Sequence, residues 1–486
     1  MGTGATSARA IILPLALAQF IASYAATNMN VAIGDIARDL DTTVAGLQTT
    51  ITLFTLTMAS LMIPGSKLTD IWGRKRCFLI GLVVYEVGAI LAALAPGLGL
   101  MVVGYSLLQG VGSALMIPPI YILVTASFTD VKARARYYGV VSGAAGLGAA
   151  AGPLVGGLIT SLLSWRASFL LQVLVVAWVI LLARRITAPE YHGLRPRFDV
   201  IGAVLAAVGM FFVVLGIMQS RTYGWIRSRE DFTIGNTVVI PKGGISPVWL
   251  IVGIGVLALA AFVWHLWRRE KAGKAPLLRL RLFRSRAANL GLGTQAIQWL
   301  TIQGTFFVTS VFLQEVRSYS AIQTGLMLTP ATIGILVSSA GAERFAKRHS
   351  QRWLVIVGFG LTVVGMGLQL ALVRDQSSVL SSVPGLLLMG LGVGAMLTSS
   401  VNIVQSSFPD RDQADISGLS RSVSNLGSSL GTAVAGSILV AAANPGGRPY
   451  AAALVALTAT ALVGLGLAAL LPRPTERRSG DGLQPP

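Results

Sequence analysis

Two charged side chains, Glu86 and Arg421, lie within long apolar runs of the sequence. A charge near the centre of a bilayer costs about 2.5 to 3.5 kcal/mol or more, so such groups are functional candidates. Glu86 lies in the middle of its run, where burial would let its carboxyl group take up a proton, and it is the proton-coupling candidate. Structural bonding to a neighbouring helix remains an alternative for Glu86. Arg421 could attract an anionic cargo, pair with Glu86, or anchor its own helix end near the lipid phosphates.

Uncharged polar side chains recur in the other apolar runs. Amide groups can bind a ligand without adding charge, and with aromatic rings they could line an adaptable amphipathic cavity. Hydrogen bonding between helices explains any single one equally well. The cargo-cavity candidates are Thr27, Asn28, Asn30, Gln109, Gln172, Gln295, Gln298, Trp299, Gln303, Asn402, Arg421 and Asn425.

No pattern in the sequence indicates catalysis. There is no Walker loop for ATP, no cluster of metal ligands and no nucleophile with an adjacent base. The three histidines lie far apart, and the single cysteine, Cys77, excludes a disulfide framework and a multi-cysteine metal site. We therefore expect a protein that is not an enzyme, with no catalytic residues, no cofactor and no metal.

The elements that must position these residues are membrane-spanning helices. The chain is 53% hydrophobic and 12% charged, with a mean hydropathy of +0.71, whereas about a quarter of the residues of soluble proteins are charged. Its apolar runs of about twenty residues match the length that a helix needs to cross hydrocarbon. The first run is too long for a cleavable signal. We predict an all-α polytopic membrane protein with fourteen transmembrane helices, over 11–33, 45–64, 77–95, 99–125, 137–162, 167–183, 200–219, 248–267, 288–313, 321–341, 353–373, 379–404, 414–441 and 449–471.

The net charge of +19 does not indicate a nucleic-acid partner, because the basic residues are scattered through short connections. Most of the 38 Lys and Arg residues fall in alternate connections, as the positive-inside rule requires. We therefore expect a multi-pass protein of the cytoplasmic (inner) membrane, with both termini in the cytoplasm.

An internal repeat indicates two related halves. Duplicated halves suit a transporter that rocks about a central site. The repeated glycines are Gly139, Gly148, Gly152 and Gly157, which recur at one constant offset as Gly418, Gly427, Gly431 and Gly436.

The predicted organisation places an inserted helix pair between two six-helix bundles. The bundles cover 1–185 and 287–472, and the inserted pair covers 186–286. This insertion includes an external loop over 220–247, with a possible hairpin in 232–240, and a basic cytoplasmic linker over 268–286. Residues 473–486 form a cytoplasmic tail.

The segment 65–76 follows the second apolar run and has the composition of a cytoplasmic latch. Its one carboxylate can bond a helix N-terminus or an arginine, and its glycines allow close approach and a tight turn. A plain basic loop is the alternative. The predicted gate residues are Gly65, Asp70, Gly73, Arg74, Lys75 and Arg76.

The fifth apolar run carries small residues along one helix face and a proline in its interior. Such a face lets helices pack closely and bend in lipid. The residues of this pattern are Gly139, Gly148, Gly152, Pro153, Gly156 and Gly157.

Together these two segments resemble the major facilitator superfamily, and within it the fourteen-span drug:proton antiporter family of multidrug efflux type. The first matches the family's loop signature and the second its antiporter signature. The resemblance implies alternating access, with cargo bound between two six-helix bundles and export driven by inward proton flow. It extends over most of the chain through Gln109-Gly110-Val111-Gly112, Trp165-Arg166, Pro276-Leu277-Leu278, Leu282-Phe283, Leu313-Gln314, Tyr319-Ser320-Ala321, Gly325 and Pro330.

Three positions depart from the family pattern. The acidic residue expected two positions before Thr27 is Ala25, and the arginine expected three positions before Gln109 is Ser106. Gly34 replaces a common proline. The two missing charges remove the family's most obvious proton relay, which leaves Glu86 as the replacement candidate.

The leading functional prediction is a secondary transporter that exports amphipathic or lipophilic, drug-like small molecules, with proton antiport as the expected coupling. A proton-independent facilitator or a lipid or glycolipid carrier is the alternative. A non-transporting membrane sensor or scaffold is the alternative of another class. The expected partners are a small-molecule cargo, the lipid bilayer and protons, and we expect a monomer.

Overall fold

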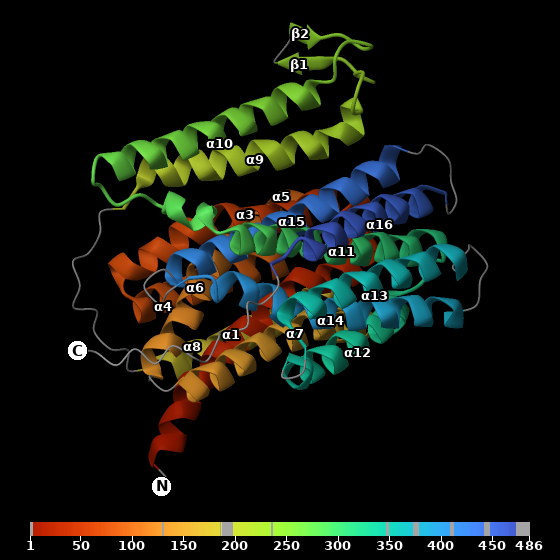
Figure 1. The fold of residues 1–486 in the computed structure, drawn as a ribbon. Helices are drawn as coiled ribbons and strands as arrows, with labels where there is room; N and C mark the ends of the chain where they lie inside the picture. Colours follow the sequence, from red (N-terminus) through yellow and green to blue (C-terminus); the bar gives the residue numbers. More distant parts are fainter. Residues whose placement is uncertain are drawn as a thin grey trace.

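The computed structural model describes residues 3–128, 131–184, 186, 198–234, 237–346, 349–372, 379–408, 413–441 and 448–472. Long helices run back and forth along one common direction (Figure 1). A helix satisfies its own backbone hydrogen bonds, as any segment exposed to lipid must. The helical elements are α1 (Thr3–Val31), α2 (Ile33–Asp39), α3 (Val44–Trp72), α4 (Arg74–Ala93), α5 (Leu98–Met101), η1 (Val102–Gln109), α6 (Gly110–Ser127), α7 (Val131–Leu162), α8 (Trp165–Ala183), α9 (Val200–Tyr223), α10 (Pro247–Lys271), η2 (Leu280–Arg284), α11 (Arg286–Val311), η3 (Phe312–Val316), α12 (Ala321–Ala346), α13 (Gln351–Leu372), η4 (Val379–Ser382), α14 (Val383–Gln405), α15 (Gln413–Ala441) and α16 (Arg448–Ala469).

Short polar side chains mark the starts of several helices. The side chains of Thr43, Ser164, Asp199, Ser246 and Ser285 each accept a hydrogen bond from a backbone N–H in the first turn that follows. The first backbone N–H groups of a helix have no partner within it, so these caps fix where each helix begins.

The described residues contain 12 helices that are long and apolar enough to cross a membrane, or 13 if one bent pair is a single span. That pair lies within α7, where segments Gly139–Ala149 and Ala151–Leu162 meet at 41°. Pro153 follows the break, and a proline in a helix interior removes a backbone hydrogen bond and bends the helix. The serine-rich α15 would be a fourteenth, so the predicted number of fourteen spans stays a prediction.

The repeated glycines occupy matching positions in two helix pairs. A Cβ atom on Gly148 of α7 would lie closer than 3.0 Å to the Phe20 carbonyl oxygen of α1. A Cβ atom on Gly427 of α15 would meet the Ala296 carbonyl oxygen of α11 in the same way. Helix α7 therefore packs on α1 as α15 packs on α11.

The same two helices also cross between the halves of the chain. Near the C-terminal end of α7, Gly157 lies against the Ala321 carbonyl of α12. At the corresponding place in α15, Gly436 lies against the side chain of Gln48 in α3. The repeat predicted from the glycines is thus present in the helix packing.

Helices α9 and α10 lie side by side on one flank of the bundle (Figure 1). Helix α9 packs against both α3 and α15, with Val214 and Met218 buried between Leu56 of α3 and Ala433 of α15. Helix α9 therefore covers a seam where helices from the two halves of the sequence meet.

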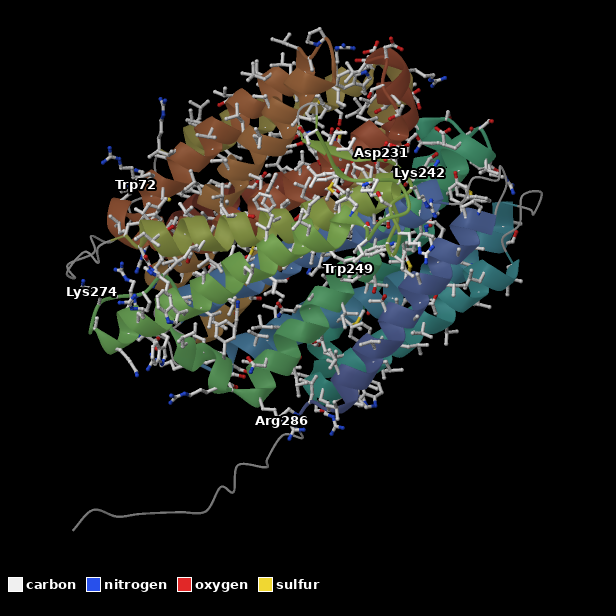
Figure 2. All side chains as sticks on the ribbon, turned by 90° about the horizontal axis from the view of Figure 1, so that it is seen from above. Trp72, Asp231, Lys242, Trp249, Lys274 and Arg286 are labelled. Carbon is white, nitrogen blue, oxygen red and sulfur yellow. The ribbon has the colours of Figure 1, made fainter. Side chains whose placement is uncertain are left out.

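A small antiparallel hairpin joins α9 to α10. Strand β1 (Phe232–Ile234) pairs with β2 (Thr237–Ile240), which confirms the hairpin predicted in this segment. Figure 2 shows Asp231 and Lys242 beside this hairpin, with Trp72 and Lys274 at the other end of the bundle. We name these two ends the hairpin end and the Gly73 end.

Candidate transport site and gates

Three side chains form a buried hydrogen-bonded group within the first half. The Tyr85 hydroxyl of α4 donates to Gln172 Oε1 of α8 over 2.7 Å, and Gln109 Nε2 of η1 donates to the same oxygen over 3.2 Å. All three side chains are fully buried. Gln109 Oε1 and Gln172 Nε2 have no hydrogen-bond partner among the described residues. The two amides thus join three helices and keep unused polar atoms.

The polar residues of α1 also form hydrogen bonds with neighbouring helices. Asn28 Nδ2 donates to Ser168 Oγ over 2.9 Å, and the same oxygen lies 2.6 Å from the Tyr24 hydroxyl. Asn30 accepts at its backbone carbonyl from Gln314 Nε2 over 3.0 Å, while the polar atoms of its buried side chain have no partner in the described part of the chain. Asn30 is therefore the residue of this group with the most unused bonding capacity.

Thr27 has a specific partner that sequence reasoning missed. Pro153 has no N–H, so the carbonyl four residues earlier, at Ala149, loses its normal helical partner. The Thr27 hydroxyl lies 3.1 Å from that carbonyl oxygen and can donate to it, as well as to carbonyls of its own helix. Thr27 therefore supports the bent α7 helix from α1.

We expect Thr27→Val to destabilise the protein by about 1 to 3 kcal/mol, because it leaves the partly buried Ala149 carbonyl without this donor. Thr27→Ser keeps the hydroxyl and serves as the control. In a double-mutant cycle followed by thermal unfolding in detergent, Pro153→Ala restores the backbone N–H and should reduce the cost of Thr27→Val. Equal costs in both backgrounds would contradict this role for Thr27.

The glutamine side chains of α11 in the second half form hydrogen bonds mainly with residues of α14 and α15. Gln295 Nε2 of α11 donates to the Ser400 carbonyl of α14 over 3.0 Å, and Gln295 Oε1 accepts from Ser420 Oγ of α15 over 2.6 Å. Gln298 Oε1 accepts from Ser400 Oγ over 2.9 Å. Gln303 Nε2 reaches across to the Ala26 carbonyl of α1 over 3.4 Å.

Three other predicted cavity residues are more accessible. Trp299 of α11 and Asn425 of α15 are half-buried, and Asn402 of α14 is exposed close to the helix end. These side chains are better placed to meet a ligand than the fully buried glutamines.

Glu86 does not point into the bundle interior. It is half-buried in α4, at the edge of an exposed strip formed by Val83, Val87 and Ile90. The opposite face of α4 packs on η1, α6 and α8. Arg421 contacts Tyr121, so the alternative in which Arg421 pairs with Glu86 is wrong in this structure, and Glu86 instead lies at the edge of the exposed face of its helix. Its role in proton coupling stays a prediction.

At Ala25 and Ser106, where the family resemblance leads us to expect charged side chains, the structure has hydrogen bonds between neutral groups. Ala25 is fully buried, and its carbonyl accepts from the Tyr105 hydroxyl over 3.0 Å. Ser106 is fully buried in η1 and donates to the Thr50 carbonyl of α3 over 2.7 Å. Helices α1, α3 and η1 are thus held together here without an ion pair.

The partner of Arg421 is an aromatic ring in the other half of the chain. Its guanidinium donates a short hydrogen bond to the Tyr121 hydroxyl of α6 and lies 4.9 Å from the centre of the Tyr121 ring. Cation–π contact and hydrogen bonding act together here. The sequence contained no signal for this pair, since the two residues lie 300 positions apart.

The Gly73 end contains several contacts between α3 and its neighbours. Lys67 Nζ forms an ion pair with Asp415 Oδ1 of α15 at 2.5 Å, and Gly65 lies against the Ala114 carbonyl of α6. Ser66 lies beside Gly418 of α15. The ion pair links the two halves and was not predicted.

The predicted gate residues around the turn are placed as follows. Gly73 has φ +90°, which favours glycine, and it lies between α3 and α4. Lys75 Nζ donates to the Arg184 carbonyl over 2.8 Å. Arg74 is half-buried and Arg76 is exposed. Asp70 belongs to α3, but its side chain lies outside the described residues, so its predicted latch contact stays a prediction.

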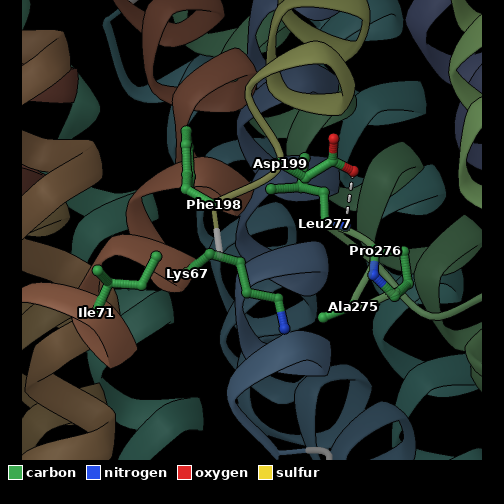
Figure 3. Close-up of a pocket in the computed structure, with 7 residues that line it drawn as sticks. All are labelled: Lys67, Ile71, Phe198, Asp199, Ala275, Pro276 and Leu277. Atoms are coloured by element: carbon green, nitrogen blue, oxygen red, sulfur yellow. Dashed lines mark hydrogen bonds between the residues drawn. The ribbon is translucent and has the colours of Figure 1, made fainter. Parts of the chain in front are cut away.

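The buried carboxylate of Asp199 accepts several hydrogen bonds that we did not predict from the sequence. This N-cap of α9 accepts at Oδ1 from His265 Nε2 (2.9 Å) and Arg269 Nη1 (3.3 Å), and at Oδ2 from the Leu277 N–H (3.1 Å). Figure 3 shows the bond to Leu277, with the Lys67 amine pointing away from Asp199. Burial alone raises the pKa of Asp199, but the bonds from His265 and the backbone, with the Arg269 charge, lower it below its ordinary value.

The hairpin end is closed by contacts between the halves. The Gly34 N–H donates to Gln314 Oε1 over 2.8 Å, and the Ile322 N–H of α12 donates to Ser161 Oγ of α7 over 2.9 Å. At the same end, Arg166 forms an ion pair with Asp39 within the first half. Both ends of the bundle thus hold the two halves together in this conformation.

Comparison with known proteins gives consistent family matches. The family model described as Major Facilitator Superfamily matches residues 15–432, and a second match covers residues 295–485. The chain is 28% identical to the multidrug resistance protein Stp of Mycobacterium tuberculosis (strain CDC 1551 / Oshkosh), over 88% of this chain and 75% of that protein.

Two further relatives are named as exporters. The cephamycin export protein CmcT of Amycolatopsis lactamdurans is 29% identical over 89% of this chain and 85% of its own length. The tetracenomycin C resistance and export protein of Streptomyces glaucescens is 28% identical over 88% and 75%. Given this family match and its many apolar helices, the chain is a multi-pass membrane protein that belongs to the major facilitator superfamily.

Proposed function

We propose that this protein exports amphipathic, drug-like small molecules across the cell membrane by alternating access. The observation that carries the proposal is the repeated packing of α7 on α1 and α15 on α11, with contacts between the halves at both ends. Two similar halves that touch at both ends can open one end while closing the other. The names of three relatives, which refer to multidrug resistance or antibiotic export, support the export of drug-like compounds.

The finer assignment follows from the family resemblance. We place the chain in the fourteen-span drug:proton antiporter family, with the bent α7 as one span and the serine-rich α15 as another. The Gly73 end would face the cytoplasm and the hairpin end the outside. Residues 1–185 and 287–472 would form the two moving bundles, 186–286 the inserted pair, and 473–486 a cytoplasmic tail.

In this proposal, the gate at each end of the bundle opens when contacts between helices of the two halves break. The Lys67–Asp415 and Arg421–Tyr121 pairs would open when the Gly73 end admits cargo. The Ser161 and Gln314 bonds would open when the hairpin end releases it. Each of these bonds is polar, so water can take up its donors and acceptors when that end opens.

The proton-independent alternative is favoured by a specific observation. Glu86 lies at the lipid-facing edge of α4, and neutral groups occupy the interior positions of Ala25 and Ser106. A carboxyl group that carries protons across the membrane must exchange them with the water on each side through the interior of the bundle. In this conformation Glu86 lies at the edge of the exposed face of α4.

We expect Glu86→Gln to leave the rate of cargo efflux within about twofold of the native rate. The measurement is efflux of lipophilic cationic, neutral and anionic compounds from proteoliposomes, with and without an imposed pH gradient, for both chains. If the gradient drives efflux and Glu86→Gln abolishes that drive, proton antiport through Glu86 is correct. If no compound moves, the non-transporting sensor or scaffold replaces the exporter.

A further inference from the structure

The guanidinium of Arg421 has no carboxylate partner within the described part of the chain. Its hydrogen bond and its cation–π contact both involve Tyr121, which is neutral. The residue lies eight positions into α15, or about 12 Å along the helix axis, which is well inside the helix end. Within the described part of the chain, this positive charge is therefore held by one hydrogen bond and one cation–π contact.

Two acidic side chains among the described residues of the surrounding helices are used elsewhere or lie on another face. Asp415 of the same helix is paired with Lys67, and Glu86 lies on the outer edge of α4. The part of α11 that packs on α15 carries neutral amides, such as Gln295 and Gln298. Arg421 therefore carries a positive charge that no described side chain neutralises, and a partly desolvated charge of this kind is suited to hold an anion.

The side chain of Arg421 is also only partly buried. The neighbours of Arg421 that contact α3, such as Ser422 and Ser429, are fully buried. Arg421 and Asn425, one turn apart on the same face, are only half-buried. This face of α15 can therefore present a cation and an amide to a ligand between the halves.

We propose that Arg421 binds the anionic group of the cargo, and that the cargo is an amphipathic organic anion whose export is driven by the membrane potential. This inference rests on the proposed export function. The anion replaces the Tyr121 hydroxyl on the guanidinium, so cargo binding opens the contact between α6 and α15. Asn425 supplies a second donor beside the guanidinium.

This assignment accounts for the missing proton relay. Arg421 returns unloaded after release, so each cycle moves only the charge of the cargo. The interior of a cell is negative, and a potential of about 100 mV supports a concentration ratio of about 50-fold for a monovalent anion. An exporter of anions therefore needs no carboxylate at the positions of Ala25 and Ser106.

The test uses three fluorescent probes that share a dansyl group and differ in charge: anionic dansylglycine, neutral dansylglycinamide and cationic dansylcadaverine. Each is loaded into proteoliposomes of the native chain, and valinomycin with a potassium gradient sets the potential. We expect inside-negative potential to accelerate dansylglycine efflux by about tenfold, with no response to a pH gradient.

Variants at the site separate binding from folding. Arg421→Gln should weaken dansylglycine binding in detergent by at least about tenfold, Arg421→Lys should retain part of it, and Tyr121→Phe should bind dansylglycine at least as tightly as the native chain. Thermal unfolding checks that each variant is folded. If Arg421→Gln fails to fold, the Arg421→Lys and Tyr121→Phe results still decide the question.

The outcomes distinguish this inference from the export function. If only the neutral or cationic probe moves, or if dansylglycine binds equally well to the native chain and both Arg421 variants, the anion site is wrong and the exporter stands. If none of the three probes binds or moves, both the anion site and the export of amphipathic molecules are wrong.

Discussion

Gly148→Ala is expected to lower the thermal stability of the protein and to reduce cargo efflux by at least about tenfold. The added methyl group would lie closer than 3.0 Å to the Phe20 carbonyl oxygen. The obstructing atom belongs to the backbone of α1, so no side-chain rotation relieves the overlap, and α1 and α7 must move apart. Overpacking of this kind costs about 1 to 3 kcal/mol, and here it also shifts a helix that contacts α12 across the halves.

A matched control lies in the same helix. A Cβ atom on Gly143 meets nothing within 4 Å, so Gly143→Ala should leave efflux unchanged and slightly favour the helix. The internal repeat provides a second test. Gly427→Ala should lower thermal stability and efflux as Gly148→Ala does, because its methyl group would overlap the Ala296 carbonyl oxygen. Equal behaviour of Gly143→Ala and Gly148→Ala, measured by thermal unfolding and efflux, would show that close packing on α1 is dispensable.

Much of the architecture could be predicted because membrane helices leave a strong one-dimensional signal. Long apolar runs gave nearly all the helices, and alternation in 232–240 gave the hairpin. The repeated glycines predicted related halves, since glycine is placed where another backbone approaches closely. The bend in α7 could be expected from Pro153.

The candidate site could be predicted only in part, because the identity of a hydrogen-bond partner depends on helix rotation. Composition marks Glu86 as a charge within a span, but only the rotation of α4 decides whether it faces lipid or interior. The pairing of Arg421 with Tyr121 joins helices from different halves, and no local pattern encodes it. The same is true of Thr27, whose partner is a carbonyl freed by a distant proline.

Asp199→Ala should destabilise the protein by about 2 to 4 kcal/mol, and it should loosen α9 and α10 from the Gly73 end. The side chain caps α9 at Gly202 and accepts the Leu277 N–H, so its loss leaves buried donors without partners. It also removes the anion between His265 and Arg269 of α10. Thermal unfolding in detergent measures the stability, and limited proteolysis of the basic linker measures the loosening.

Asp199→Asn separates the charge from the shape, because an amide oxygen can still cap α9. The pKa of Asp199 is lowered in the folded protein, so its charge contributes stability above the ordinary pKa of about 3.9, and this contribution is lost as the pH falls through the lowered value. The stability difference between native and Asp199→Asn chains should therefore be constant near neutral pH and shrink in acid. Asp35→Asn is the control, because Asp35 pairs with Arg38 near the surface and should matter little. A native-minus-Asp199→Asn difference that grew in acid would mean that the buried carboxylate opposes folding, contrary to the geometry at the start of α9.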